Sequence, residues 1–298
     1  MSWNGRAPAG RIAYVDGRYL PHGQASIHIE DRGLQLGDAV YEVCAISDGL
    51  LQDEEEHLDR LERSLGEIGM AMPMSRHVLA LVMRELVRRN RTRTGLLYLQ
   101  VTRGAARRDH PIPKDVIRPT LIMTVHELDA AALSRRREEG IKVITRPDER
   151  WARCDIKTTQ LLANLLAKTA ARQAGAYEAW LVDDEGFVTE GSSTNAWIVD
   201  GEGRLTTRQL SHDILPGVTR RVILAAAEEA QLRVFERKFT PEEASRAREA
   251  FISSAAGVIP VTAIDGHQIG EGRPGPLTKR VQQLYAHRSS AAAAKLSR

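Results

Sequence analysis

The sequence predicts an α+β fold with two domains. Its first half consists of apolar strand patterns with two amphipathic helix patterns in the middle, an arrangement typical of α+β proteins. Its 298 residues are enough for two domains of ordinary size. Hydrophobic residues make up 42% and charged residues 27% of the chain, values that favour a folded globular protein over a disordered one.

In the first half, apolar runs predict strands, and apolar residues spaced by three or four positions predict helices. The predicted strands cover residues 12–15, 18–20, 39–46, 96–102 and 119–125, and the predicted helices begin at residue 54 and span 76–89. Asp16-Gly17 predicts a hairpin turn between the first two strands, because Gly readily adopts a positive φ. Residues 103–113 form a polar loop between the last two strands.

The second half begins after a predicted connector. We place this connector at residues 129–131, between a small domain over 1–128 and a larger domain over 132–298. The charge run at 135–139 is expected to be a solvated surface. The predicted strands cover 141–145, 153–157, 178–182, 187–199, 250–254 and 257–261, and the predicted helices begin near residues 161, 216, 241 and 275. Thr240-Pro241-Glu242-Glu243 reads as a capping box for the third of these helices.

Lys157 lies at the end of the predicted strand 153–157. On a strand, Arg153, Asp155 and Lys157 share one face. Desolvating an ammonium group is costly, and a site can use this cost to keep a lysine neutral and nucleophilic. Taken alone, Lys157 is explained at least as well as an exposed lysine after a short strand.

Four other features could bind a ligand. Glu190 opens a polar turn that continues to Asn195, and its carboxylate could face a cationic ring. Leu215-Pro216-Gly217-Val218-Thr219 begins a helix, whose free N–H groups could bind an anion. Ser254-Ala255 is a second small-residue turn, and Arg60 could pair with a phosphate. Taken alone, the Glu190 turn and Arg60 are better explained as an ordinary turn and a surface arginine, and the helix start and the second turn are explained about as well by simple capping.

Together, these motifs resemble the class IV, fold-type IV pyridoxal-phosphate aminotransferases, over about residues 14–284. The motifs, in order, are Gly37-Asp38-Ala39-Val40-Tyr41-Glu42, His57-Leu58-Asp59-Arg60-Leu61, Lys157, Glu190-Gly191-Ser192-Ser193-Thr194-Asn195, Gly217-Val218-Thr219 and Ser254-Ala255-Ala256. The resemblance implies a two-domain fold, with a small α/β N-terminal domain and a larger C-terminal domain of mainly antiparallel strands plus helices. It also implies a homodimer.

The resemblance implies a role for each motif. Lys157 would hold pyridoxal phosphate as a Schiff base and then move the Cα proton of the substrate. Glu190 would pair with the pyridinium nitrogen, and Leu215 would pack on a face of the ring. The remaining cofactor-binding residues, several of them around the phosphate, would be Arg60, Ser193, Thr194, Asn195, Val218, Thr219, Ser254 and Ala255.

The polar loop after the strand at 96–102 indicates the substrate. Arg108 and His110, with Tyr41, resemble the carboxylate-binding set of the D-amino acid transaminases in this family, and Val43 would line the side-chain pocket. A guanidinium group can grip a carboxylate with two hydrogen bonds. The resemblance therefore implies ping-pong transfer of the amino group of a D-amino acid, such as D-alanine, to a 2-oxo acid such as 2-oxoglutarate.

Other functions remain open at this point. They are a branched-chain L-amino acid transaminase, a 4-amino-4-deoxychorismate lyase and a catalytically silent binding protein of this fold. A net charge of +3 gives no support for nucleic-acid binding, and no apolar run approaches the roughly 20 residues needed to span a membrane. The two cysteines, Cys44 and Cys154, cannot build a disulfide framework or a metal cage, and the N-terminus lacks a signal-peptide pattern, so a cytoplasmic location is expected.

Overall fold

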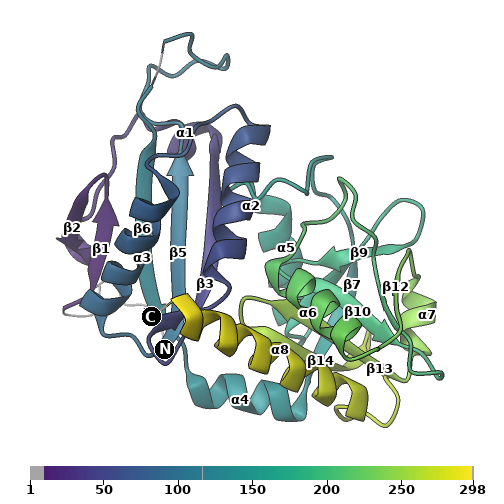
Figure 1. The fold of residues 1–298 in the computed structure, drawn as a ribbon. Helices are drawn as coiled ribbons and strands as arrows, with labels where there is room; N and C mark the ends of the chain where they lie inside the picture. The colour runs from purple at the N-terminus through teal and green to yellow at the C-terminus, as the bar shows by residue number, and fades with distance from the viewer. Residues whose placement is uncertain (1–9, 116, 297–298) are drawn as a thin grey trace. The chain divides into compact units, whose positions relative to one another are not determined.

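The structure is a computed structural model that describes residues 10–115 and 117–296, with side chains described up to residue 289. The chain forms two compact units, each with its own sheet (Figure 1). The first unit is formed mainly by the chain up to Leu128 together with Ile156–Gln160. The second is formed by Asp129–Asp155 and Leu161–Ala292.

The first unit contains an antiparallel six-stranded sheet in the order β2-β1-β6-β5-β3-β4. Its strands are β1 (Ile12–Val15), β2 (Arg18–Pro21), β3 (Ala39–Ser47), β4 (Leu50–Leu51), β5 (Thr94–Thr102) and β6 (Thr120–Glu127). Its helices are η1 (His22–Gln24), α1 (Arg32–Leu36), α2 (Glu54–Glu67) and α3 (Arg76–Asn90). The strands and helices predicted for this half are confirmed, with ends shifted by a few residues.

One face of this sheet is covered by α2 and α3 (Figure 1). Leu58 and Leu61 of α2 pack in the same core as Leu79 of α3 and as Val40 and Cys44 of β3. Because side chains alternate along a strand, Tyr41, Val43 and Ala45 point away from this core and are only half-buried. The alternation of β3 thus leaves one sheet face free for a site.

The second unit contains a mixed nine-stranded sheet in the order β12-β11-β10-β13-β14-β7-β8-β9, with β15 paired to β14. Its strands are β7 (Ile141–Pro147), β8 (Glu178–Val182), β9 (Val188–Gly191), β10 (Asn195–Val199), β11 (Leu205–Thr207), β12 (Val234–Glu236), β13 (Glu249–Ser254), β14 (Gly257–Ile264) and β15 (His267–Gln268). Its helices are α4 (Ala130–Glu139), α5 (Leu162–Gln173), α6 (Val218–Glu229), α7 (Pro241–Ser245) and α8 (Pro276–Leu296). Antiparallel pairs predominate, as expected.

Both faces of this sheet are buried. Phe251 and Trp197 belong to a core with Ile223 of α6 and Val281 of α8, whereas the neighbouring Ile252 belongs to a separate core on the other face. Strands buried on both sides read as continuous apolar runs. The strand predicted at 250–254 is confirmed as β13, and its apolar run has this character.

Three local predictions for the second half differ from the structure. Residues 153–157 form a turn, not a strand, and only the Lys157 carbonyl in this stretch accepts a backbone hydrogen bond from β3, from the Tyr41 N–H over 3.0 Å. The single strand predicted at 187–199 is split into β9 and β10, because Gly191 N donates to Thr194 O over 2.7 Å and closes a tight turn. Residues 129–131, expected as a connector, are the N-cap and first residues of α4, which also carries the charge run. The assignment of the two units to separate domains stays a prediction.

Candidate active site

Lys157 is fixed on the edge of β3 by backbone hydrogen bonds. The Tyr41 N–H donates to the Lys157 carbonyl over 3.0 Å, and the Thr159 N–H donates to the Ala39 carbonyl over 3.2 Å. Ile156, next to the lysine, is buried in the core of the first unit. The lysine backbone is thus held on both sides, although it does not belong to a strand.

The amine of Lys157 is presented to the free face of the first sheet. Its Nζ lies 4.2 Å from the centroid of the Tyr41 ring, which stacks on Tyr98 with 5.7 Å between ring centroids. Burial raises the pKa of Tyr98 to about 12. Val43 is the register partner of Tyr98 in β5 and shares the sheet face of Tyr41. Lys157, Tyr41 and Val43, three of the predicted site residues, therefore meet on this face.

Arg60, on α2, forms a buried ion pair with Glu42 of β3. Its Nε donates to Glu42 Oε1 over 2.8 Å and its Nη2 donates to Oε2 over 2.7 Å. His57 Nδ1 lies 2.7 Å from the same carboxylate. Burial alone would raise the pKa of Glu42, but Arg60 and His57 hold it well below its usual value. The carboxylate is therefore ionised, and it fixes the direction of the Arg60 side chain.

A hydrogen bond connects Lys157 to the helix of Arg60. The Lys157 N–H donates to Ser64 Oγ over 3.4 Å. Ser64 is one helical turn after Arg60, so both lie on the same side of α2. The predicted phosphate ligand and the predicted cofactor lysine are thus anchored to neighbouring turns of one element.

In the second unit, Glu190 is buried within a set of donors. Its Oε1 accepts hydrogen bonds from Arg150 Nη1 and, over 3.1 Å, from Leu215 N, and its Oε2 accepts from Asn195 Nδ2 over 2.9 Å. Arg150 also pairs with Asp148, with 2.7 Å between Nη2 and Oδ2. Burial raises the pKa of Glu190, and Arg150 acts in the opposite direction. A carboxylate oxygen has two lone-pair directions, so Oε2 keeps acceptor capacity beside its bond to Asn195.

Asn195 links Glu190 to the start of α6. Its amide also donates to the Leu215 carbonyl over 3.0 Å. Gly217, the N-cap of α6, offers no side-chain cap, and a Cβ at this position would come within 2.0 Å of Asn195 Oδ1. Gly217 is therefore needed so that the start of α6 can approach Asn195 this closely. The first N–H groups of a helix have no partner within the helix, so those of Val218 and Thr219 are available to another group.

The first turn of α6 is tied to the turn between β13 and β14. Thr219 Oγ1 donates to the Ser254 carbonyl over 2.7 Å, and Ser254 Oγ accepts from the Ala256 N–H over 3.2 Å. Ala255, between these residues, is half-buried. The structure thus brings Glu190, Asn195, Leu215, Val218, Thr219, Ser254 and Ala255 into one connected region of the second unit.

The hydroxyl residues after Glu190 face different partners. Ser193 Oγ donates to Glu178 Oε2 over 2.8 Å, and Lys168 Nζ pairs with the same oxygen over 2.9 Å. Thr194 Oγ1 is buried and has no hydrogen-bond partner within the described part of the chain. Ser193 therefore lies in a separate ion-pair cluster, whereas Thr194 offers an unused polar atom beside Asn195.

These residues fit the cofactor that the resemblance implies. The N-terminus of a twelve-residue helix without a side-chain cap suits a phosphate, since its free N–H groups and dipole favour an anion. A buried carboxylate held by a guanidinium and an amide suits a pyridinium nitrogen. The presented amine of Lys157 suits an aldehyde.

The loop that carries Arg108 and His110 is exposed. In the described part of the chain, neither side chain makes a hydrogen bond or an ion pair. The loop backbone is held by Arg32, whose Nη1 donates to the Asp109 carbonyl over 2.8 Å. The structure therefore does not join Arg108 and His110 to Tyr41 within one chain.

Sequence reasoning missed Arg150 and Arg32. Arg150 has no motif of its own, since it follows the end of β7, and only the fold shows that it contacts Glu190. Arg32 follows Asp31, a recognisable N-cap residue, shortly before the Gly-Asp-Ala-Val-Tyr-Glu motif. The short distance in sequence between Arg32 and this motif is the signal that could have identified Arg32.

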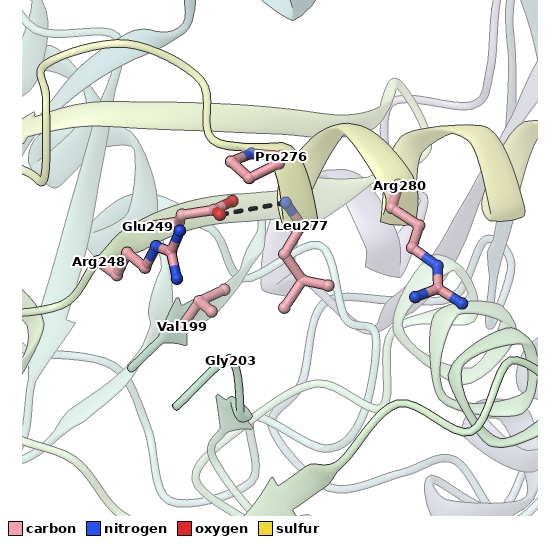
Figure 2. A pocket seen from close by; sticks show the side chains of 7 residues that line it. All are labelled: Val199, Gly203, Arg248, Glu249, Pro276, Leu277 and Arg280. Carbon is pink, nitrogen blue, oxygen red and sulfur yellow. Dashed lines mark hydrogen bonds between the residues drawn. The ribbon is translucent and has the colours of Figure 1, made fainter. Parts of the chain in front are cut away.

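A cavity of about 310 Å³ in the second unit is lined by none of the residues above (Figure 2). Its walls are Val199, Gly203, Arg248, Glu249, Pro276, Leu277 and Arg280. Glu249 accepts hydrogen bonds from the N–H groups of Leu277, over 3.1 Å, and Thr278, over 2.7 Å. The carboxylate thus serves as a cap for α8, and the cavity lacks a free buried polar group among the described residues.

Two negative findings hold for the described residues, 10–115 and 117–296. None of their His, Cys, Asp and Glu side chains form a cluster of three or more that could hold a metal ion. None of their helices is both long enough and apolar enough to cross a membrane.

Comparisons with known proteins identify the family of this chain. The family model of amino-transferase class IV matches residues 39–264. The D-alanine aminotransferase of Bacillus licheniformis is 42% identical over 90% of this chain and 93% of its own length.

Solved structures share the fold. The branched-chain amino acid aminotransferase of Escherichia coli has a TM-score of 0.86 at 26% identity and covers 94% of this chain and 95% of its own. A hypothetical aminotransferase from Mycobacterium tuberculosis, solved in its PLP-bound form, has a TM-score of 0.81 at 21% identity and covers 94% of this chain and 99% of its own. The chain is therefore a member of the class IV aminotransferases, the pyridoxal-phosphate enzymes that its motifs resembled.

Proposed function

We propose that this chain is a D-amino acid transaminase that moves the amino group of a D-amino acid, such as D-alanine, to a 2-oxo acid, such as 2-oxoglutarate. The observation that carries the proposal is the 42% identity to a D-alanine aminotransferase over 90% of the chain. The branched-chain enzyme of the same fold is only 26% identical. Tyr41, Arg108 and His110, which match the carboxylate-binding set of D-amino acid transaminases, support the same choice.

The cofactor-binding residues are proposed from the two sets described above. Lys157 would hold pyridoxal phosphate covalently, and Glu190 would pair with its ring nitrogen. The phosphate would accept hydrogen bonds from the N–H groups of Val218 and Thr219. It would also contact the Ser254-Ala255 turn and Arg60. Leu215 would pack on the ring, with Thr194 and Asn195 completing the pocket and Ser193 beside them in the same turn. When bound, the cofactor supplies an electron sink for the carbanion at Cα.

The protein residues would then perform three tasks. Lys157 would move the Cα proton with its amine, which lies beside the Tyr41 ring. Glu190 would keep a positive ring nitrogen charged, because a carboxylate stabilises the protonated form. Val43, on the face of Tyr41, would limit the size of the substrate side chain.

The α-carboxylate of the substrate would be bound by Arg108, His110 and Tyr41. We propose a homodimer in which the exposed loop of Arg108 and His110 serves the site of the other subunit. Two observations support this arrangement: among the described residues, the side chains of Arg108 and His110 make no hydrogen bond or ion pair, and α5 exposes Leu162, Leu165 and Leu166. We also propose a cytoplasmic location, since Cys44 and Cys154 are both free.

Chiral analysis of the products tests the proposal. Purified enzyme is supplied with pyridoxal phosphate, D-alanine and 2-oxoglutarate, and in parallel with L-leucine, L-valine and L-alanine. We expect D-glutamate from the first mixture, and a strongly reduced rate for Arg108→Ala with D-alanine. Glutamate formed only as the L isomer would reject the proposal in favour of a branched-chain L-transaminase. Pyruvate release from aminodeoxychorismate without an amino acceptor would instead indicate the lyase.

A further inference from the structure

Arg32 is a buried arginine that connects two parts of the first unit. Its side chain is 4% exposed. Its backbone is fixed at the start of α1, because its N–H donates to the Gly104 carbonyl over 2.9 Å. The preceding Asp31 caps the helix through Gly33 N, at 2.8 Å, and accepts from Thr102 Oγ1, also at 2.8 Å. The guanidinium therefore extends from an immobile base.

The near side of the guanidinium is held by Asp38. Arg32 Nε donates to Asp38 Oδ2 over 2.8 Å, and Arg103 Nε donates to the same oxygen over 2.7 Å. Burial alone would raise the pKa of Asp38, but Arg103 and Arg32 keep it below its usual value. Asp38 is thus ionised between two arginines, and this pairing fixes the plane of the Arg32 fork.

The far side of the guanidinium reaches an otherwise exposed loop. Nη1 donates to the Asp109 carbonyl over 2.8 Å, and Nη2 donates to the His110 carbonyl over 3.4 Å. Arg108 and His110 flank the first of these carbonyls and have exposed side chains. The contact is to backbone, so it holds the path of the chain and leaves both side chains available.

We propose that Arg32 is the positioning residue for substrate-carboxylate binding: it holds the loop at Asp109–His110 so that Arg108 and His110 are presented in one arrangement. This inference rests on the proposed function of Arg108 and His110. Binding groups that are ordered beforehand do not have to be ordered by the substrate. Loss of the contact should therefore weaken substrate binding more than cofactor binding or folding.

An arginine is required by the geometry. Its planar fork places three nitrogens against Asp38 and two successive carbonyls at once. A lysine has one point charge on a flexible stem, so it could keep the pairing with Asp38 while losing the loop carbonyls. Arg32→Lys thus removes the contact with the loop but keeps a positive charge beside Asp38, whereas Arg32→Gln removes the charge as well.

Arg103 supplies a matched control. It shares Asp38, but its other contacts are to the carbonyls at the end of α2, Ile68 O at 2.7 Å and Gly69 O at 3.3 Å, and not to the loop at 109–110. Arg103→Gln therefore disturbs the same carboxylate without removing the loop contact.

The experiment compares the dimeric enzyme, loaded with pyridoxal phosphate, as wild type, Arg32→Lys, Arg32→Gln and Arg103→Gln. Three quantities are measured: amide hydrogen exchange of residues 107–110 and 112, the KM values for D-alanine and 2-oxoglutarate, and the affinity for pyridoxal phosphate. For both Arg32 variants we expect exchange in the loop to rise roughly tenfold, KM for both substrates to rise roughly tenfold, and cofactor affinity to stay nearly constant. Arg103→Gln should leave loop exchange and KM near the wild-type values.

Unchanged loop exchange in Arg32→Lys and Arg32→Gln would overturn the inference, as would an equal rise in Arg103→Gln. The exchange measurement needs no substrate. If the wild type transaminates no D-amino acid, the proposed function fails, while faster exchange in the Arg32 variants would still show that Arg32 holds the loop. If exchange rises but KM does not, the positioning role is rejected and only a structural contact remains.

Discussion

The amine of Lys157 lies 4.2 Å from the centre of the Tyr41 ring, on the sheet face that α2 and α3 leave uncovered. The segment that carries it is attached to β3 by two backbone hydrogen bonds. Within the described residues of the first unit, no carboxylate forms an ion pair with this amine. Lys157 differs in this respect from Lys168, whose Nζ lies 4.4 Å from the Tyr177 ring but pairs with Glu178.

Lys157→Ala should abolish transamination. The amine is the proposed covalent anchor and proton carrier, so we expect the rate to fall by at least about 10²–10⁴-fold, the usual contribution of a positioned acid–base group. Borohydride reduction followed by peptide mass analysis should find the cofactor attached to Lys157 in the wild type and nowhere in Lys157→Ala. Lys168→Ala is the control, because it removes a lysine with a similar ring contact. Labelling that persists in Lys157→Ala, or disappears in Lys168→Ala, would contradict the assignment.

Arg150→Met should reduce activity at the acid end of the pH range. Burial raises the pKa of Glu190 and Arg150 opposes this effect, so removing Arg150 moves the pKa further upward. At a given pH below that pKa, a smaller fraction of Glu190 is ionised and able to hold a positive ring nitrogen. We expect kcat/KM near neutral pH to fall roughly ten- to hundredfold, with the acid limb of the pH profile shifted to higher pH.

Asp148→Asn provides the matched comparison for this prediction. Asp148 pairs with Arg150 and its negative charge raises the pKa of Glu190. Neutralising Asp148 should therefore move the acid limb in the opposite direction, to lower pH, and leave cofactor binding intact. A shift of the same sign in Arg150→Met and Asp148→Asn would show that Arg150 acts only through local structure.

The sequence is sufficient to place many of the site residues on the right kind of local structure. Tyr41 lies on a strand, Val218 begins a helix and Ser254 ends a strand, because the apolar periodicity around these residues is strong and Gly and Pro mark the boundaries. The strand predicted at Lys157 is wrong. The alternation of charged and apolar residues is present, but the segment is held by two backbone hydrogen bonds to the distant β3, and this attachment leaves no periodic signal.

Ion pairs between residues distant in sequence are the features that cannot be predicted from sequence. Glu42 is part of a recognised motif, yet its pairing with Arg60 and His57 depends on how α2 packs on β3. The helix predicted to begin near residue 161 is confirmed as α5, but the residues that this helix buries are Ala167 and Ala171 rather than Leu162, Leu165 and Leu166. Periodicity identifies an apolar face and does not identify what covers that face.

Glu42→Gln should destabilise the protein most strongly at neutral pH. The variant leaves the buried guanidinium of Arg60 without its charged partner, and breaking a buried pair in this way typically costs about 3–5 kcal/mol of unfolding free energy. The pKa of Glu42 is held below its usual value. Its contribution is therefore fully present above the usual carboxyl pKa and is lost as the pH falls through the lower, folded-state value.

Denaturant unfolding of wild type and Glu42→Gln at pH 7 and at pH 3 measures this contribution. The difference in unfolding free energy should be larger at pH 7 than at pH 3. Asp48→Asn is the control, because the Asp48–Arg93 pair is exposed, at 82% and 80% of the two side chains, and exposed pairs contribute little. An equal loss of unfolding free energy in Glu42→Gln and Asp48→Asn would mean that the buried Glu42 pair stabilises the protein no more than an exposed pair does.

Leu165→Glu combined with Leu166→Glu should weaken the proposed homodimer. Leu162, Leu165 and Leu166 are 71%, 60% and 59% exposed on one face of α5, and adjacent large apolar side chains at helical spacing usually mark an interaction surface. Two carboxylates on this face would be desolvated without partners on association, so sedimentation equilibrium should show a shift toward monomer of at least about tenfold in Kd.

Val78→Glu, together with Leu81→Glu, is the matched control, because these exposed residues are also apolar and lie on α3. If the α5 variant remains as dimeric as the wild type while the α3 variant dissociates, subunits associate through α3 and the proposed role of α5 is wrong.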